Sequence, residues 1–163
     1  MEVLLMETIS SSRAFDVLRG KGRSMTAYEG NKAIAERWML ELWEKGDYDL
    51  ANEIISPDYS RHDPFIELRG PQEYVEKVVK PLRGAFPDAK YTIEEMIAER
   101  EYVLIKWSFV GTHAGDLQGI PPTGVKAEHD GMDLLRFVDG KIVESWPGFD
   151  GVRVLKTLGV IPV

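Results

Sequence analysis

Helical patterns occupy the first half of this chain and strand patterns the second half, and this segregation constrains the fold more than any other feature. Apolar residues recur at helical spacing over residues 31–45 and again after Gly70-Pro71. Four later segments are predicted strands: 91–97, 102–112, 125–137 and 141–146. Because the helices precede the strands instead of alternating with them, we predict an α+β fold with helices on one curved face of a mostly antiparallel sheet.

Capping and breaking residues bound the predicted helices. Asn31 is a suitable N-cap for the first helix, and Gly46 ends it. Asp47 can cap a short second helix, which must end before Pro57 because proline disfavours helical geometry in the preceding residue. Pro81 lacks an N–H, so we expect the third helix to bend or to have an irregular last turn.

Turn signals organise the rest of the chain. Residues 59–63 are expected to be extended, and Asp139-Gly140 predicts a hairpin turn between the last two strands. Asp150 can cap a closing helix that ends at Gly159.

Composition bounds the domain count and the classes of partner. The 163 residues fit a single domain over 25–163, preceded by an arm or tail at 1–24. Twenty basic and 27 acidic residues give a formal charge of −7, which disfavours nucleic acid and anionic membranes as partners. The chain has no cysteine, which excludes disulfides and thiolate chemistry and fits a reducing cytoplasm. Its N-terminal apolar run is too short for a signal sequence or a membrane span.

The third predicted strand carries the sharpest chemical signal. Residues two apart share a face of a strand, so His129, Gly131 and Asp133 point the same way. His129 and Asp133 would lie roughly 13 Å apart, too far for a hydrogen-bonded pair, but they could flank a ligand with Gly131 leaving room. Burial of Asp133 among apolar neighbours would raise its pKa toward that of a general base. The alternative is that this face is exposed or covered by another subunit.

The other two histidines have weaker signals. His62 precedes Asp63-Pro64 at an expected cavity rim, although Asp63 could simply form a turn beside a partly exposed histidine. His113 is expected to fix the following loop by a hydrogen bond. The three histidines lack the paired spacing of zinc sites, and the chain contains neither a phosphate-binding loop nor a serine-nucleophile motif, so we expect no metal and no cofactor.

The chain resembles the SnoaL-like polyketide cyclase family, within the group of cone-shaped domains that includes nuclear transport factor 2 and ketosteroid isomerase. The resemblance covers about residues 31–159. It rests on YSRHDP at 59–64, RGPQEY at 69–74, GTHAGDLQGIPPTG at 111–124 and LLRFVDGKIVESW at 134–146. It implies a cone with a hydrophobic pocket between the helices and a strongly curved sheet, and a homodimer or higher homo-oligomer formed through the sheet.

The resemblance also implies an intramolecular aldol closure of a polyketide ester by acid/base side chains, without metal or cofactor. The family's histidine falls at Asp133, and its catalytic aspartate falls at Pro147, or at Ser145 if the Trp-Pro pair is aligned instead. Both acid/base residues are therefore changed. An aromatic residue of the family pocket falls near Trp43.

Two hypotheses from different classes follow. In the first, the protein is an enzyme acting by general acid/base chemistry on a hydrophobic carbonyl substrate. Asp133 would be the base and His129 or His62 would donate to or orient the substrate oxygen. Five aromatic residues would shape the pocket: Trp43, Tyr59, Phe65, Trp107 and Trp146. In the second, the cone binds an apolar small molecule without catalysis. Epoxide hydrolysis is a third possibility, although an Asp-Arg-Asp arrangement is not apparent around Asp133 and Pro147.

Overall fold

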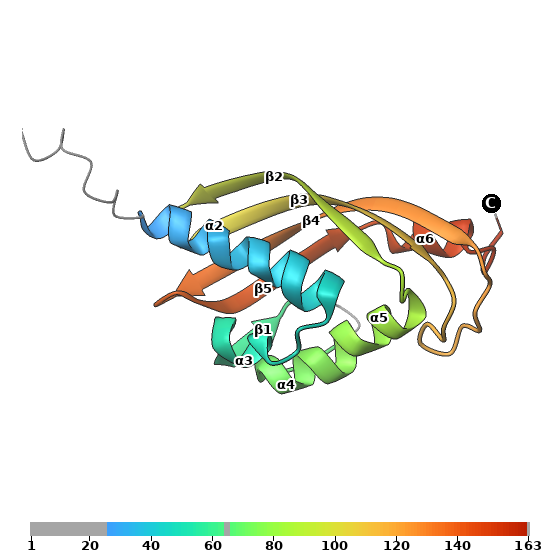
Figure 1. Ribbon diagram of the computed structural model, residues 1–163, viewed down its shortest axis with the longest axis horizontal. Coiled ribbons are helices and arrows are strands. Elements are labelled where there is room, and N and C mark those ends of the chain that lie inside the picture. The colour runs from blue at the N-terminus through green and yellow to red at the C-terminus, as the bar shows by residue number, and fades with distance from the viewer. Residues whose placement is uncertain (1–25, 64–65, 163) are drawn as a thin grey trace, which may run out of the picture.

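A strongly curved five-stranded sheet forms one side of the molecule (Figure 1). The computed structural model describes residues 26–63 and 66–162. The strands are β1 (Ile55–Arg61), β2 (Lys90–Glu99), β3 (Tyr102–Thr112), β4 (Lys126–Val138) and β5 (Lys141–Phe149). Their order across the sheet is β1-β5-β4-β3-β2, and only the β1–β5 pair is parallel. The predicted α+β class and the mostly antiparallel sheet are confirmed.

The helices lie along the concave face and at the ends of this sheet (Figure 1). Helix α2 (Ala27–Arg37) continues into the π-helical segment η1 (Trp38–Lys45), and a short α3 (Leu50–Ile54) leads into β1. The second long helical segment comprises α4 (Gly70–Tyr74), η2 (Val75–Val79) and α5 (Lys80–Ala85), and α6 (Gly151–Thr157) closes the chain. Helix α2 contacts β2 and β3, whereas α4 contacts β1.

The first helix begins earlier than predicted. Thr26, not Asn31, is the N-cap: its hydroxyl accepts the Glu29 N–H at 3.2 Å, and the Glu29 carboxylate accepts the Thr26 N–H at 2.8 Å. This reciprocal capping box satisfies two N–H groups of the first turn, which a cap at Asn31 would leave to water. The predicted end at Gly46 is confirmed, since Gly46 adopts the left-handed conformation with φ 76°.

The irregularity expected around Pro81 takes the form of a wider turn before it. The Lys80 N–H donates to the carbonyl of Val75, five residues back, and Pro81 is the second residue of the regular helix α5. Proline and wider π-type turns are both recognised causes of irregularity within a helix.

All four predicted strands are present, and β1 begins at Ile55, before the expected start at residue 59. Pro57 is tolerated in β1 because this is an edge strand. Asp139 and Gly140 both have positive φ, 49° and 72°, as a tight hairpin turn requires. A bulge between β4 and β5 near Phe137 adds to the curvature of the sheet.

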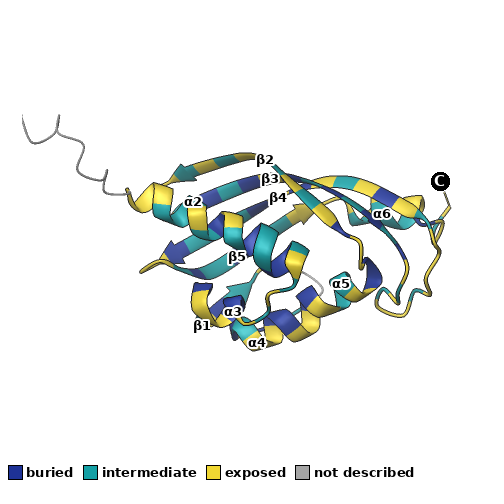
Figure 2. Ribbon diagram, viewed as in Figure 1, coloured by how far each residue is buried: buried dark blue, intermediate teal, exposed yellow. Residues whose placement is uncertain are grey.

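The core lies between the concave face and the helices (Figure 2). Trp38 stacks on Tyr74 with ring centroids 6.4 Å apart, and Trp43 meets Trp38 edge-on at 5.9 Å. Within residues 26–63 and 66–162, no helix is long and apolar enough to cross a membrane. The predicted arm at 1–24 lies outside the described residues.

Candidate active site

A cavity of about 470 Å³ opens between the concave face of the sheet and the helices. Its walls are largely apolar and aromatic, with Trp38, Trp43, Trp107 and Phe109 among the lining residues. Five titratable side chains also reach it: Arg61, Asp63, Tyr91, His129 and Asp133. A concave apolar site of this size with a few convergent polar groups is typical of small-molecule sites, which span roughly 300–1,000 Å³.

Asp133 lies on β4 and is the most deeply buried carboxylate of this cavity, with 5% exposure. The Trp107 Nε1–H donates to its Oδ2 at 2.6 Å. Burial raises the pKa of Asp133 to about 6, against the opposing effects of the Arg61 charge and the Trp107 hydrogen bond. The carboxyl group is therefore mostly ionised at pH 7 and is a stronger base than an exposed aspartate.

Gly131 allows Trp107 to reach Asp133. The two residues are cross-strand partners on β4 and β3, and the indole ring covers the glycine. A Cβ atom on Gly131 would lie 2.4 Å from Cζ2 of Trp107 and 2.8 Å from the carbonyl oxygen of Gly148. The sequence suggested that Gly131 leaves room for a ligand; the structure shows that the space holds the indole.

His129 lies on the same face as Asp133, as the strand period predicts, and both line the cavity. Its ring packs against Phe109 at 4.5 Å and Trp107 at 5.7 Å. Burial lowers the pKa of His129, so the imidazole is neutral near pH 7. Its Nδ1 is buried and has no hydrogen-bond partner in the described part of the chain, which leaves that atom for a ligand.

Arg61 and Asp63 line the cavity, although no motif in the sequence marked either of them as a site residue. Nε of Arg61 lies 3.3 Å from Oδ2 of Asp63, and the two side chains are only 6% and 12% exposed. The guanidinium also lies over the Tyr74 ring, 5.9 Å from its centroid. The alternation of β1, extended two residues past its end at Arg61, could have found Arg61 and Asp63, because positions two and four beyond Tyr59 then share its inward face.

Trp43 lines the cavity, whereas Tyr59 lies behind the lining. The Trp43 Nε1–H donates to the Tyr74 hydroxyl at 2.9 Å. Tyr59 is fully buried, its hydroxyl lies 2.5 Å from Oγ of Ser145, and burial raises its pKa to about 12. We therefore correct the expected role of Tyr59 to support of the site rather than contact with a ligand.

His62 and Trp146 were expected at the pocket, but the structure places them on the opposite face of the sheet. Their rings stack at 4.5 Å, and Nε2 of His62 lies 3.0 Å from the Glu144 carboxylate. Arg61 faces inward, so its neighbour His62 faces outward. Ser145 faces inward and turns Trp146 outward in the same way. Phe65, the remaining predicted pocket residue, lies outside the described residues.

His113 fixes the following loop, as expected. Its ring is fully buried and its Nδ1 accepts the Thr123 N–H at 3.3 Å. The Gly124 N–H donates to the His113 carbonyl at 2.9 Å. The enclosed loop contributes Leu117 and Ile120 to the cavity wall.

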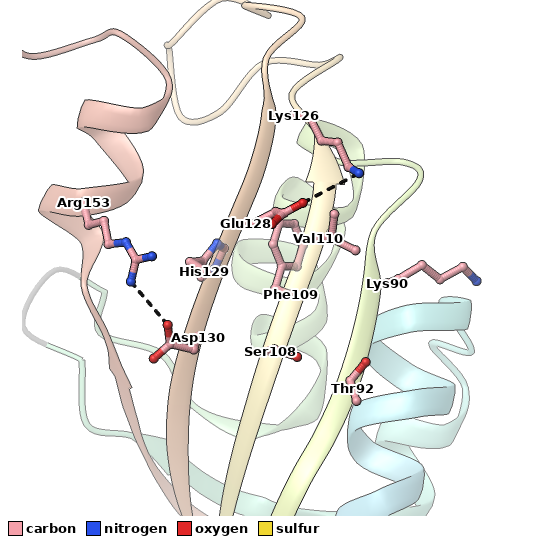
Figure 3. A pocket seen from close by; sticks show the side chains of 10 residues that line it. All are labelled: Lys90, Thr92, Ser108, Phe109, Val110, Lys126, Glu128, His129, Asp130 and Arg153. Atoms are coloured by element: carbon pink, nitrogen blue, oxygen red, sulfur yellow. Dashed lines mark hydrogen bonds and ion pairs between the residues drawn. The ribbon is translucent and has the colours of Figure 1, made fainter.

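A second, more open hollow lies at the outer face of the sheet (Figure 3). Most of its charged groups pair with one another: Arg153 with Asp130 at 3.3 Å, and Lys126 with Glu128 at 3.7 Å. Since these charges are exposed and mutually neutralised, the hollow offers a ligand little net attraction. Over the described residues, no group of three or more His, Asp or Glu side chains is arranged to hold a metal ion.

The fold and the cavity together define a cone-shaped domain with a site for a small molecule, and acid/base groups line that site. The sequence model described as SnoaL-like polyketide cyclase matches residues 33–158. The chain belongs to the SnoaL-like polyketide cyclase family.

Two relatives are about one third identical to this chain over the residues that align. The aklanonic acid methyl ester cyclase DauD of Streptomyces sp. (strain C5) is 33% identical over 124 residues, 71% of this chain and 74% of the relative. The nogalonic acid methyl ester cyclase of Streptomyces nogalater is 32% identical over 126 residues, 74% of this chain and 92% of the relative. A structure of AclR, a putative hydroxylase from Streptomyces galilaeus, superimposes with a TM-score of 0.73 at 28% identity and covers 84% of this chain and 85% of its own.

The two positions that the resemblance assigns to the family's acid/base pair are neighbours in the sheet. Asp133 and Pro147 are cross-strand partners on β4 and β5, and both line the cavity. Ser145, the alternative position, is turned toward Tyr59 behind the lining. Of the cross-strand pair Asp133 and Pro147, only Asp133 has a carboxyl group, and it lies on β4.

Proposed function

We propose that the protein catalyses a cyclase-type reaction on a hydrophobic carbonyl compound, with Asp133 as general base. The observation that carries this proposal is the Asp133 carboxyl group itself, buried in an aromatic cavity and held by the Trp107 N–H at 2.6 Å. The membership of the chain in the SnoaL-like family supports the reaction class.

The proposed reaction is an intramolecular aldol closure. Asp133 takes a proton from the carbon next to a substrate carbonyl, and the resulting enolate carbon attacks a second carbonyl carbon of the same molecule. One C–C bond forms, and the new alkoxide oxygen takes up a proton, which the Asp133 carboxyl group returns. No atom is lost, and the base is regenerated.

We propose a flat polyketide ester as the substrate class, by analogy with the methyl esters named for the relatives. Trp43 and Trp107 provide large aromatic surfaces for such a ring system. The unpartnered Nδ1 of His129 would orient one of its oxygens. We further propose a cytoplasmic location, with the domain at residues 25–163.

We also propose a homodimer or a higher homo-oligomer. Ile97 and Met132 on the outer face of the sheet are 55% and 51% exposed, which supports a second copy of the chain covering that face.

The test of the cyclase is turnover of aklanonic acid methyl ester and nogalonic acid methyl ester by the wild-type chain and by Asp133→Asn. Loss of the base should lower kcat by about 10²- to 10⁴-fold. Asp130→Asn is the matched control, because Asp130 lies on the same strand with a side chain that is 68% exposed. It should leave kcat unchanged. Undiminished turnover by Asp133→Asn would remove Asp133 from the mechanism, and tight binding of both esters without turnover by the wild type would identify a binding protein.

A second candidate function is epoxide opening. The cavity contains the carboxylates of Asp133 and Asp63, and the Arg61 guanidinium interacts electrostatically with both. The three residues form an Asp-Arg-Asp set, which was not apparent in the sequence around Asp133 and Pro147. Hydrolysis of limonene oxide to a diol by the wild type, with no conversion of either ester, would favour this function over cyclisation.

A further inference from the structure

The Arg61 guanidinium is a buried cation of the cavity that has no role in the proton transfer proposed for Asp133. We propose that the Arg61 guanidinium is an oxyanion subsite: it binds the substrate oxygen on which negative charge develops when a proton is removed. The inference deepens the proposed function and rests on its choice of Asp133 as the base. The ligand chemistry is an enolate, phenolate or similar oxyanion on an otherwise apolar, flat molecule.

The position of Arg61 leaves donors for a ligand. A guanidinium has five N–H donors. The ion pair with Asp63 engages Nε at 3.3 Å. The Tyr59 hydroxyl is a second acceptor for Arg61. It has only two lone pairs and also interacts with Ser145, so it engages at most two of the donors. At least two guanidinium donors therefore remain, on a side chain that lines the cavity.

The residues of β5 that lie between Arg61 and Asp133 are small. In the sheet, β5 lies between β1 and β4. Arg61 is paired with Ser145, and Asp133 with Pro147 two residues farther along β5. Neither side chain is long enough to separate the guanidinium from the carboxylate. Burial raises the pKa of Asp133, and the charge of Arg61 accordingly offsets part of that rise.

This arrangement conserves the charge of the site during proton transfer. Before the transfer, the cavity contains the carboxylates of Asp133 and Asp63 and one guanidinium. After it, Asp133 is neutral and the negative charge is on the substrate oxygen. A fixed cation near both positions stabilises the charge after it moves and needs no reorganisation, which is the requirement for an oxyanion site.

The probe is 2-naphthol, compared with naphthalene, which has the same rings but no oxygen. Asp133→Asn provides the background, because the amide imitates the protonated aspartate that faces the oxyanion. In this variant, bound 2-naphthol should ionise at a lower pH than free 2-naphthol, as read from its absorption spectrum. Adding Arg61→Gln should abolish that difference and weaken 2-naphthol binding at least tenfold, with naphthalene affinity unchanged.

Arg153→Gln in the same background is the control for general loss of positive charge, since Arg153 lies on α6 and its side chain is 59% exposed. It should leave 2-naphthol binding unchanged. Equal ionisation and affinity with and without Arg61 would overturn the proposal.

A measurement on an intact Arg61 covers the case in which Arg61→Gln fails to fold. The Arg61 Nε–H signal of the Asp133→Asn variant should shift in a ¹⁵N NMR spectrum with 2-naphthol and not with naphthalene. An unmoved signal at saturating 2-naphthol would overturn the proposal. Turnover retained by Asp133→Asn would refute the proposed base and leave the binding result standing, so the two failures are distinguishable.

Discussion

Gly131→Ala should loosen the hydrogen bond that holds the Asp133 carboxyl group. The added Cβ would lie 2.4 Å from Cζ2 of Trp107, whereas ordinary contact begins at 3.4 Å, so the indole must retreat by 3.4 − 2.4 = 1.0 Å. A retreat of that size along the bond would lengthen the Trp107–Asp133 distance from 2.6 Å to about 3.6 Å. A separation of that length is no longer a hydrogen bond.

Two magnitudes follow from this displacement. Overpacking of a filled site costs about 1–3 kcal/mol, so the Tm of a chain of this size should fall by roughly 2–12 °C. A hydrogen bond to a charged group contributes about 1.5–3 kcal/mol. Because that bond lowers the pKa of Asp133, its loss should raise the pKa above the present value of about 6.

The assay combines thermal unfolding with ¹³C NMR titration of the aspartate carboxyl groups, in which the Asp133 signal is assigned through its absence in Asp133→Asn. Gly84→Ala is the control, because a Cβ on Gly84 in α5 meets no atom within 4 Å. It should leave Tm equal or slightly higher. A Gly131→Ala chain with the Tm and the Asp133 pKa of the wild type would refute the assignment of Gly131 as the residue that admits the indole.

Two further predictions concern stability. The raised pKa of Asp133 means that the folded state binds its proton more tightly than the unfolded state does. The contribution of this group to the free energy of unfolding therefore falls as the pH rises from about 4 to about 6, by about 3 kcal/mol in all. Asp133→Asn should therefore be more stable than the wild type at pH 7 and lose most of that advantage at pH 4 in urea unfolding; equal differences at both pH values would contradict this. Tyr59→Phe leaves the buried Ser145 hydroxyl without its 2.5 Å partner and should cost about 1–3 kcal/mol, whereas Tyr28→Phe at an exposed position should change stability by less than about 0.5 kcal/mol.

The period of a strand tells which residues share a face, and this part of the site was predictable. It placed His129 and Asp133 together on β4, and the structure confirms their common face. The same period excludes His62 from a cavity that Tyr59 approaches, because three positions separate the two residues. Consistent use of the alternation would have selected Arg61 and Asp63 in place of His62.

Trp146 could not be placed from the sequence because a bulge reverses the alternation of β5. Ile142 faces the core, and an uninterrupted strand would turn Glu144 and Trp146 inward as well. The pairing shifts near Phe137, where one extra residue of β5 is accommodated, and Ser145 becomes the inward residue. No glycine or other local signal in KIVESW marks this shift, which depends on long-range pairing with β4.

The proton inventory of the cavity favours aldol closure over epoxide opening. Epoxide opening needs a base for water and a separate acid for the epoxide oxygen. Asp133 can serve as the base, but the Asp63 carboxylate is engaged in the ion pair with Arg61. His129 and Tyr91 are also poor acids, since burial lowers the pKa of His129, which leaves the ring neutral near pH 7, and raises the pKa of Tyr91. Aldol closure requires only one group that removes a proton and returns it, and a carboxyl group with a pKa of about 6 can do both near neutral pH. The resemblance assigns the family's aspartate to Pro147 or Ser145 on β5, neither of which has a carboxyl group, so Asp133 on β4 would supply both steps alone.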